Sequence, residues 1–343
     1  MPRIAIIGLG LIGGSLGLAL KRSQLRDVEF TGFSRSRETR EKARKMGAID
    51  RVAGSAADAA GDASVVIIAT PIAVIPDVME EIASTLQEDS IVTDVASTKR
   101  QVMRWAEELL PDNVSFIGGH PMAGKEQTGI EVAEASLFDS KPYCIIPSVH
   151  AKEAAVNSVV GLAELTGAAP VFMDAEEHDS YVAAVSHLPL VVSMALFSLV
   201  HDSTAWPEMA QLASSGFRDV TRLASGSPDM SDDICGTNAE NIVHWLDRMT
   251  AELGRYRELI SGDDEEALFQ AFARVKRDRD AFLAGGATPR HREKTADAGI
   301  GLSDLLMGHW AASRAREAMR TIESQQSLPQ HRQRSKHRPK KER

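Results

Sequence analysis

The sequence predicts an α/β fold in which a parallel-sheet domain is followed by an all-helical domain. Up to about residue 174, short apolar runs alternate with helical patterns, which is typical of βαβ units. From residue 175 the strand-like runs stop, while helical periodicity continues to about residue 285. We therefore expect one domain over residues 1–174, a second over residues 175–285, and a segment over residues 286–343 with one extra helix and a basic, disordered tail.

The strands of the first domain are predicted from apolar runs that are mostly continuous rather than alternating. A continuous run is expected where helices cover both faces of a sheet. The runs are Arg3–Ile7, Val28–Phe33, Ser64–Ala69, Ser90–Val95, Val114–Gly118, Tyr143–Ile146 and Pro170–Met173. The helical patterns between them are Leu11–Arg22, Glu38–Met46, Ile75–Thr85, Lys99–Leu110 and Lys152–Thr166.

The second domain contains only helical patterns. They are Ala175–Leu199, Pro207–Ala224, Asn238–Ile260 and Glu265–Leu283. Pro189 lies inside the first of these and is expected to kink or break it, because proline has no N–H to donate. Beyond them, Gly301–Glu323 could form one more helix, and Leu328–Arg343 holds seven Lys or Arg against one Glu. We interpret this basic end as a solvated tail.

The composition is that of an ordinary globular protein, with 43% hydrophobic and 25% charged residues. The net charge of −9 argues against a nucleic-acid surface. Cys144 and Cys235 are the only cysteines, which favours a reducing compartment over a disulfide framework. We expect a cytoplasmic protein with no membrane span, since no run of 18 or more apolar residues occurs. We expect no metal site, because no cluster has the spacing of metal ligands.

A glycine motif follows the first predicted strand and opens the first helix. Gly8, Gly10 and Gly13, with Leu11 and Ile12 between them, match the GxGxxG fingerprint of Rossmann-type domains. Such glycines allow a tight turn, a close approach of backbone to a pyrophosphate and close helix–strand packing. We therefore interpret residues 1–174 as a dinucleotide-binding domain. Its other expected cofactor contacts are Thr70, Pro71 and Ser97.

The end of the second strand predicts which dinucleotide is preferred. An NAD-binding chain places an acidic residue there to bind the ribose 2′-hydroxyl. This chain has Ser34, Arg35 and Arg37 instead, which suit a 2′-phosphate. We expect NADP as the preferred cofactor, with NAD as the alternative. The other interpretation of the two arginines is that they are surface charges at the start of a helix.

Two further motifs follow later strands of the same sheet. Ser97 lies in Asp94–Lys99 (DVASTK), and His120 lies in Gly119–Glu126 (GHPMAGKE). In an open α/β sheet, ligands bind outside the carboxyl ends of the strands. A histidine placed there can accept a proton from a hydroxyl group as a hydride leaves the same carbon. We therefore predict Ser97 and His120 as catalytic residues.

Several motifs in the same order give the chain a specific resemblance to the prephenate/arogenate dehydrogenase family of tyrosine biosynthesis. It covers about residues 1–283. The motifs are the Gly8–Gly13 loop, DVASTK, GHPMAGKE, His178-Asp179, Ser186–Pro189 (SHLP) and Gly216–Ala224 (GFRDVTRLA). The resemblance implies a nucleotide-binding domain followed by a helical domain that forms a homodimer.

The resemblance also implies a reaction, an oxidative decarboxylation. A hydride leaves C4 of a cyclohexadienol for the nicotinamide, and loss of CO2 makes the ring aromatic. By this resemblance His120 takes the proton of the 4-hydroxyl group, and Ser97 helps to position that group. Arg222 would bind a substrate carboxylate, and Asp219 lies one helical turn earlier on the same face.

Other residues of these motifs have two open interpretations. Arg218 could share in anion binding or be a solvated helix arginine, and His187 could line the substrate pocket or be a buried structural histidine. Glu126 corresponds to a family position near the substrate, but would fit equally well as a surface carboxylate. For His178-Asp179 we expect a cap or an interdomain hydrogen bond rather than chemistry.

The sequence departs from prephenate-specific relatives at two positions. Leu190 replaces a second histidine after SHLP, and Ser231 replaces a tryptophan that is common later in the helical domain. We expect prephenate as the substrate, with arogenate as a near-equal alternative. Remoter alternatives are another NADP-dependent hydroxyacid dehydrogenase, or an NADP-sensing module without catalysis. The first is disfavoured because Ala175–Leu199 contains no lysine.

Overall fold

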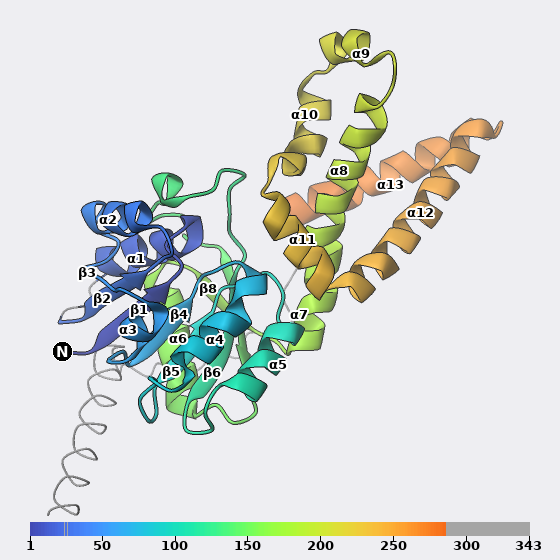
Figure 1. The fold of residues 1–343 in the computed structure, drawn as a ribbon. Coiled ribbons are helices and arrows are strands. Elements are labelled where there is room, and N and C mark those ends of the chain that lie inside the picture. Colours follow the sequence, from blue (N-terminus) through green and yellow to red (C-terminus); the bar gives the residue numbers. More distant parts are fainter. Residues whose placement is uncertain (24, 26, 286–343) are drawn as a thin grey trace, which may run out of the picture.

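An eight-stranded sheet forms the centre of the first domain in the computed structural model, which describes residues 1–23, 25 and 27–285 (Figure 1). The strand order is β3-β2-β1-β4-β5-β6-β7-β8. The strands are β1 (Arg3–Ile7), β2 (Glu29–Phe33), β3 (Arg51–Val52), β4 (Val65–Ile68), β5 (Ile91–Asp94), β6 (Ser115–Pro121), β7 (Pro142–Pro147) and β8 (Ala169–Phe172). The helices around them are α1 (Leu11–Arg22), α2 (Arg37–Lys45), α3 (Ala56–Ala60), α4 (Ile75–Ala83), α5 (Arg100–Leu109) and α6 (Glu153–Leu165).

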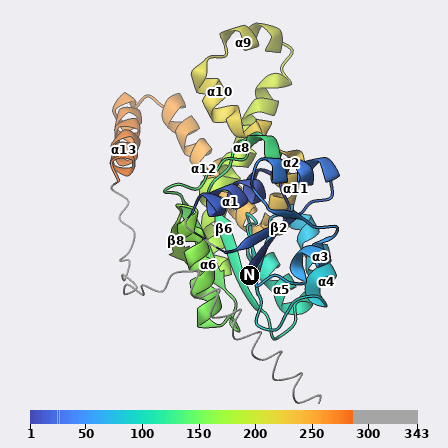
Figure 2. The same ribbon diagram turned by 90° about the vertical axis from the view of Figure 1, so that its left-hand side faces the viewer.

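Helices cover both faces of this sheet, which explains why the predicted strands are continuous apolar runs. Alternate residues of β1 enter different cores: Ile4 and Ile6 pack in one, and Ala5 and Ile7 in the other. The first core also contains residues of α1, α2 and α6, and the second contains residues of α3, α4 and α5. Figure 2 shows the two helical layers on opposite sides of the strands.

The strand order reverses between β1 and β4, which lie side by side although β2 and β3 intervene in the chain. A crevice for a ligand is expected at such a point, outside the carboxyl ends of the strands. The same edge continues over β5 and β6, which pair in parallel with β4 and with each other. The turns that follow β1, β4, β5 and the end of β6 therefore lie along one edge of the sheet.

The sequence predicted a parallel sheet, but one pair of neighbouring strands in the structure is antiparallel. β7 runs antiparallel to β6, pairing Ile117–Pro121 with Tyr143–Pro147. The connection between them holds only the short η2 turn (Ile130–Val132) and no crossover helix, so the chain returns in the opposite direction. This pairing extends β6 to Pro121, and His120 therefore lies on a strand rather than in a loop. Sequence analysis also missed β3 and α3, both of which are very short.

The second domain is entirely helical among the residues that the structure describes, as predicted. It consists of α7 (Ala175–Val182), a π-helical turn (Ala183–His187), α8 (Leu188–His201), α9 (Trp206–Leu212), α10 (Ser215–Thr221), η4 (Arg222–Ser225), α11 (Pro228–Thr237), α12 (Ala239–Ser261) and α13 (Glu265–Leu283). The predicted disturbance near Pro189 takes the form of the π-helical turn just before it. The predicted helix Pro207–Ala224 is wrong, because the chain leaves the helical conformation at Ala213 and Ser214.

Two arms of the second domain extend away from the sheet (Figure 1). One contains α8, α9 and α10, and the other is the hairpin of α12 and α13. α12 has one buried residue, Ile242, and α13 has none. The predicted helix Gly301–Glu323 and the basic tail Leu328–Arg343 lie outside the described residues.

One stretch among the described residues, Ala175–His201, is long and apolar enough to cross a membrane by length and composition alone. It comprises α7, the π-helical turn and α8. It carries His178, Asp179 and His187, which are almost completely buried against other parts of the protein. We therefore interpret this stretch as the central helix of the second domain.

Candidate active site

A pocket of about 380 Å³ lies at the carboxyl ends of β1, β2 and β4. Its wall includes Gly8, Gly10, Ser34, Arg35, Thr70 and Pro71, all of which the sequence predicted as cofactor contacts. Gly8 has a φ of +102°, and a Cβ there would lie 2.3 Å from the carbonyl oxygen of Ala69. A Cβ on Gly13 would lie 1.9 Å from the carbonyl oxygen of Gly8. Glycine is thus required at both positions.

This pocket fits a dinucleotide. A Cβ added to Gly10 would meet no atom within 4 Å, so the backbone there is open to a close approach by a ligand. The hydroxyl oxygen of Thr70 is buried and has no hydrogen-bond partner among the described residues. An unpaired buried hydroxyl is unfavourable, and a ligand in the pocket could supply the missing bond. The amino end of α1, which begins at Leu11, adds free amide donors.

The predicted residues at the end of β2 are in different positions relative to this pocket. Ser34 and Arg35 line it, whereas Arg37 is exposed in the first turn of α2 and is not in its wall. The pocket wall also carries two acidic residues of α4, Asp77 and Glu81.

The predicted base His120 is supported by a buried ion pair. Lys99 and Asp94 are both completely buried, and the Lys99 ammonium group contacts the Asp94 carboxylate. The same ammonium group donates to the carbonyl oxygen of Gly119 at 2.7 Å, and the N–H of Gly119 donates to Asp94 Oδ1 at 3.2 Å. Both hydrogen-bonding groups of the residue before His120 are therefore held. The backbone at His120 is fixed as a result.

A chain of hydrogen bonds joins His120 to the second domain. His120 Nδ1 lies 2.8 Å from Nε2 of His178 on α7, and His178 Nδ1 lies 2.8 Å from Asp179 Oδ1. Asp179 in turn accepts the backbone N–H groups of Lys99 at 2.7 Å and Arg100 at 2.9 Å, at the start of α5. The interdomain hydrogen bond predicted for His178-Asp179 is confirmed. It ends directly on the predicted base.

His120 is only 8% exposed, and it is a neutral imidazole at neutral pH. Burial lowers its pKa well below 6.5, and the nearby His178, Lys99 and His187 lower it further. With Nδ1 bonded to His178, its other ring nitrogen, Nε2, has no partner within the described part of the chain. Ser97 is half-buried in the turn between β5 and α5, beside the end of β6.

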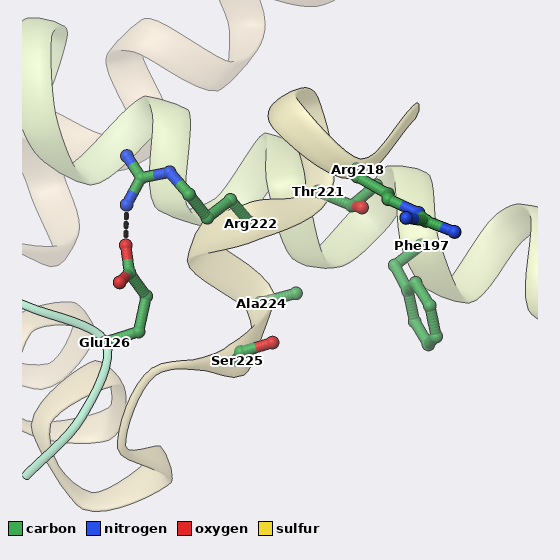
Figure 3. Close-up of a pocket in the computed structure, with 7 residues that line it drawn as sticks. All are labelled: Glu126, Phe197, Arg218, Thr221, Arg222, Ala224 and Ser225. Atoms are coloured by element: carbon green, nitrogen blue, oxygen red, sulfur yellow. Dashed lines mark ion pairs between the residues drawn. The ribbon is translucent and has the colours of Figure 1, made fainter. Parts of the chain in front are cut away.

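A second pocket, of about 410 Å³, lies mainly in the helical domain (Figure 3). It is lined by Glu126, Phe197, Arg218, Thr221, Arg222, Ala224 and Ser225. Glu126 comes from the loop after β6, and its carboxylate forms an ion pair with the Arg222 guanidinium group. The ion pair therefore joins the two domains. Asp219 is exposed on α10 and is not in the wall of this pocket.

His187 is buried in the π-helical turn, where burial lowers its pKa to about 4. The side-chain amide of Asn238 donates to the carbonyl oxygen of Asp179 at 2.8 Å and lies 3.2 Å from His187 Nδ1. The amide nitrogen thus faces Nδ1, which must accept, and the proton of His187 is on Nε2. That Nε2 is buried and has no partner among the described residues.

Comparison with known proteins agrees with this architecture. The family model described as "Prephenate dehydrogenase, nucleotide-binding domain" matches residues 16–172, and "Prephenate dehydrogenase, dimerization domain" matches residues 174–274. The chain belongs to the prephenate dehydrogenase family. It is therefore a nicotinamide dinucleotide-dependent oxidoreductase.

Similar proteins of the family include the prephenate dehydrogenase of Bacillus subtilis (strain 168), which is 37% identical over 81% of this chain and 76% of its own length. The prephenate dehydrogenase of Aquifex aeolicus, solved with hydroxyphenyl propionate and NAD+, is 30% identical with a TM-score of 0.76 over 82% of this chain and 98% of its own. The arogenate dehydrogenase of Synechocystis is 31% identical with a TM-score of 0.70 over 82% and 99%.

Sequence reasoning assigned no role to several residues that support the site in this family member. Asp94 and Lys99 stand five residues apart in the DVASTK motif, but neither letter signals a completely buried ion pair. No pattern in the sequence indicated a role for Asn238, because its contacts with Asp179 and His187 join segments more than 50 residues apart. Leu190 is buried in the apolar core that the sheet domain and the helical domain share.

Proposed function

We propose that this enzyme oxidises and decarboxylates prephenate to 4-hydroxyphenylpyruvate. One observation carries the proposal. His120 is a buried, neutral imidazole with Nε2 unpaired, and it lies at the same edge of the sheet, formed by the carboxyl ends of the strands, as the glycine turn. A bound nicotinamide dinucleotide would supply the hydride acceptor. His120 Nε2 accepts the proton of the substrate 4-hydroxyl group as the hydride leaves C4. Loss of CO2 then makes the ring aromatic, so no strong acid catalyst is needed.

Ser97 is proposed to hold the same hydroxyl group in line with His120. It follows β5, which pairs with β6, so the two side chains come from adjacent strand ends. A hydroxyl group of this kind can donate to or accept from the substrate. This role affects orientation rather than proton removal.

The substrate carries two carboxylates, and we propose that the arginines of the second pocket bind them. Arg222 is proposed to bind a substrate carboxylate in exchange for Glu126, and Arg218 shares the same wall. Glu126 then lies beside the substrate as the displaced partner. The buried Nε2–H of His187 is an unsatisfied donor, which supports a role for His187 in binding a polar group of the substrate. For Asp219, which is exposed on α10 outside the pocket wall, we propose a place beside these groups without direct contact to the substrate.

We propose NADP as the preferred cofactor. Ser34 and Arg35 in the pocket wall provide a hydroxyl group and a guanidinium group for a 2′-phosphate. Arg37, outside the wall, would add charge at longer range. A preference for NAD would instead favour Asp77 or Glu81 of the pocket wall as the partner of the ribose hydroxyl.

The working form is proposed to be a homodimer through the helical domain. The match to a dimerization-domain model supports this, and so does the exposed apolar surface of the second domain. On α13, the side chains of Phe269, Phe272 and Phe282 are all more than half exposed. Large apolar side chains exposed together on one helix are normally covered by a partner. We further propose that the enzyme acts in the cytoplasm on a small-molecule substrate.

Arogenate is the second candidate substrate. The observation that favours it is Leu190, which removes a histidine found in prephenate-specific relatives and is itself buried. Arogenate carries an ammonium group where prephenate has a keto group, and the carboxylate of Glu126, which pairs with Arg222, could receive that ammonium group.

The deciding experiment measures formation of the reduced cofactor with prephenate and arogenate in parallel, each with NADP and NAD. We expect a higher kcat/KM with prephenate and with NADP. A higher kcat/KM with arogenate selects the second candidate. Turnover of neither substrate would refute the proposed reaction.

A further inference from the structure

The hydrogen bonds from His120 to Asp179 form a line that crosses the domain boundary. They join β6 of the sheet domain to α7 of the helical domain, and both histidines and the aspartate are buried. The line ends on the first backbone N–H groups of α5, which Asp179 accepts. Asn238 on the far side donates to the Asp179 carbonyl oxygen. The backbone beside His120 and the carboxylate of Asp179 are thus both held by contacts outside the line.

The carboxylate at one end determines where the protons lie. Burial alone would raise the pKa of Asp179, but hydrogen bonds from His178 and from the amides of Arg100 and Lys99 outweigh it and lower the pKa. An ionised carboxylate can only accept, so the proton in its contact with His178 belongs to His178 Nδ1. Burial keeps His178 neutral, and its Nε2 therefore carries a lone pair.

The tautomer of His178 determines that of the proposed base, His120. The lone pair on His178 Nε2 requires a donor, and His120 Nδ1 at 2.8 Å is the group that faces it. Neutral His120 has one ring proton, which is then on Nδ1. Its Nε2 is left unprotonated. The alternative tautomer would place two lone pairs against each other in a buried site.

We propose that His178 and Asp179 are positioning residues that orient His120 and hold its ring proton on Nδ1, so that Nε2 accepts the substrate hydroxyl proton. The inference rests on the proposed function, since it takes His120 as the base. When the proton arrives on Nε2, the imidazolium keeps its Nδ1–H bond to His178 and no other proton has to move. Because His178 and Asp179 lie on α7, the base has its reactive tautomer only while the helical domain is docked on the sheet.

The first test is Asp179→Asn. An asparagine offers one carbonyl oxygen, whereas His178, Lys99 and Arg100 all donate to the carboxylate, and its NH2 group favours the opposite tautomer of His178. We expect kcat to fall on the order of 10²-fold while substrate KM changes by less than about threefold. The matched control is Asp202→Asn, in the exposed His201-Asp202 pair at the end of α8, which should leave kcat unchanged. A kcat for Asp179→Asn within about threefold of wild type would overturn the proposal.

A second pair of variants separates positioning from packing. His178→Gln keeps one acceptor and one donor in the side chain, whereas His178→Phe keeps the size of a ring and neither polar group. We expect His178→Gln to retain kcat within about tenfold and His178→Phe to lose on the order of 10²-fold or more. Equal losses in two folded variants would overturn the proposal, because they would mean that only ring packing matters.

The third measurement reads the tautomer without turnover. Nitrogen-15 NMR of protein labelled at histidine distinguishes a protonated ring nitrogen from a bare one, and the spectrum of His120→Asn assigns the His120 signals. We expect His120 with Nδ1 protonated and Nε2 bare in wild type, and the reverse or a mixture in Asp179→Asn. The opposite tautomer in wild type would overturn the proposal. If wild type turns over neither substrate, the proposed function fails, while this spectrum still tests the positioning pair.

Discussion

The two domains contribute very different groups to the proposed site. From the sheet domain come Asp94, Lys99 and His120, which are at most 8% exposed and hydrogen bonded in place. From the helical domain come Arg218 and Arg222, which are exposed and line an open pocket. We infer that the residues proposed for catalysis are already in position before the substrate binds. The arginines proposed for substrate recognition are fixed only when they bind the substrate.

The same contrast extends to the cores. Both faces of the sheet are covered by helices of its own domain, and one of the two cores also contains buried residues of the helical domain such as Leu190 and Ile234. The α12–α13 hairpin has one buried residue and exposes several aromatic side chains. The sheet domain is therefore complete in one chain, whereas the helical domain has a surface that a second copy would cover.

The largest effect is expected where the buried half of the site is changed. His120→Asn removes the proposed base, so kcat should fall by about 10²-fold or more, with little change in the Kd of the cofactor. Steady-state kinetics and cofactor titration measure the two quantities. His150→Asn, in an exposed loop, is the matched control. Normal turnover by His120→Asn would show that the buried half does not perform the chemistry.

A smaller effect is expected in the exposed half. Arg222→Gln removes the guanidinium group that is proposed to bind a carboxylate, so substrate KM should rise by on the order of 30-fold, as for the loss of a charged hydrogen bond. The exposed Arg104→Gln on α5 should leave KM unchanged. An effect confined to cofactor binding would mean that the recognition half is assigned wrongly.

The exposed apolar surface of the helical domain predicts that a charge placed there weakens the proposed dimer. Phe269→Glu places a charge on the exposed apolar surface of α13, and the dimer dissociation constant should rise by about tenfold or more. Analytical ultracentrifugation measures it, and thermal stability should become less dependent on protein concentration. Phe172→Glu, at an exposed phenylalanine of β8, is the control. A variant that stays dimeric would place the interface elsewhere.

Cofactor choice is expected to depend on one exposed side chain of the sheet domain. Arg35→Ala should raise KM for NADP by about fivefold and leave KM for NAD nearly unchanged, because only the 2′-phosphate loses a partner. Arg44→Ala, farther along α2, is the matched control. Equal effects on the two cofactors would show that Arg35 does not read the 2′ position.

The smallest change is expected with pH. The active form of His120 is unprotonated, and its pKa lies well below 6.5, so the base stays active as the pH falls to that value. We expect kcat/KM to change by less than about twofold between about pH 8 and 6.5, and to fall only as the pH drops through the lowered pKa. A half-maximal value at or above pH 6.5 would show that burial does not shift this group in solution.

Much of the fold followed from local patterns in the sequence. Continuous apolar runs predicted seven of the eight strands, and the glycine motif predicted the turn at Gly8 and Gly10 that lines the first pocket. The antiparallel pairing of β7 was missed because direction depends on how a long connection returns, which periodicity does not record. β3 and α3 are too short to give a periodic signal.

By itself, the sequence determined the order of the two domains, the glycine turn and the identities of the residues that follow the strands. These features depend on neighbours in the chain, so local spacing is enough to find them. Only the tertiary structure decided that Lys99 is buried against Asp94 and that His178 on α7 reaches His120 on β6. A side chain's burial and its hydrogen-bond partner depend on segments distant in sequence, and the same letter can be a solvated charge or a fixed part of a site.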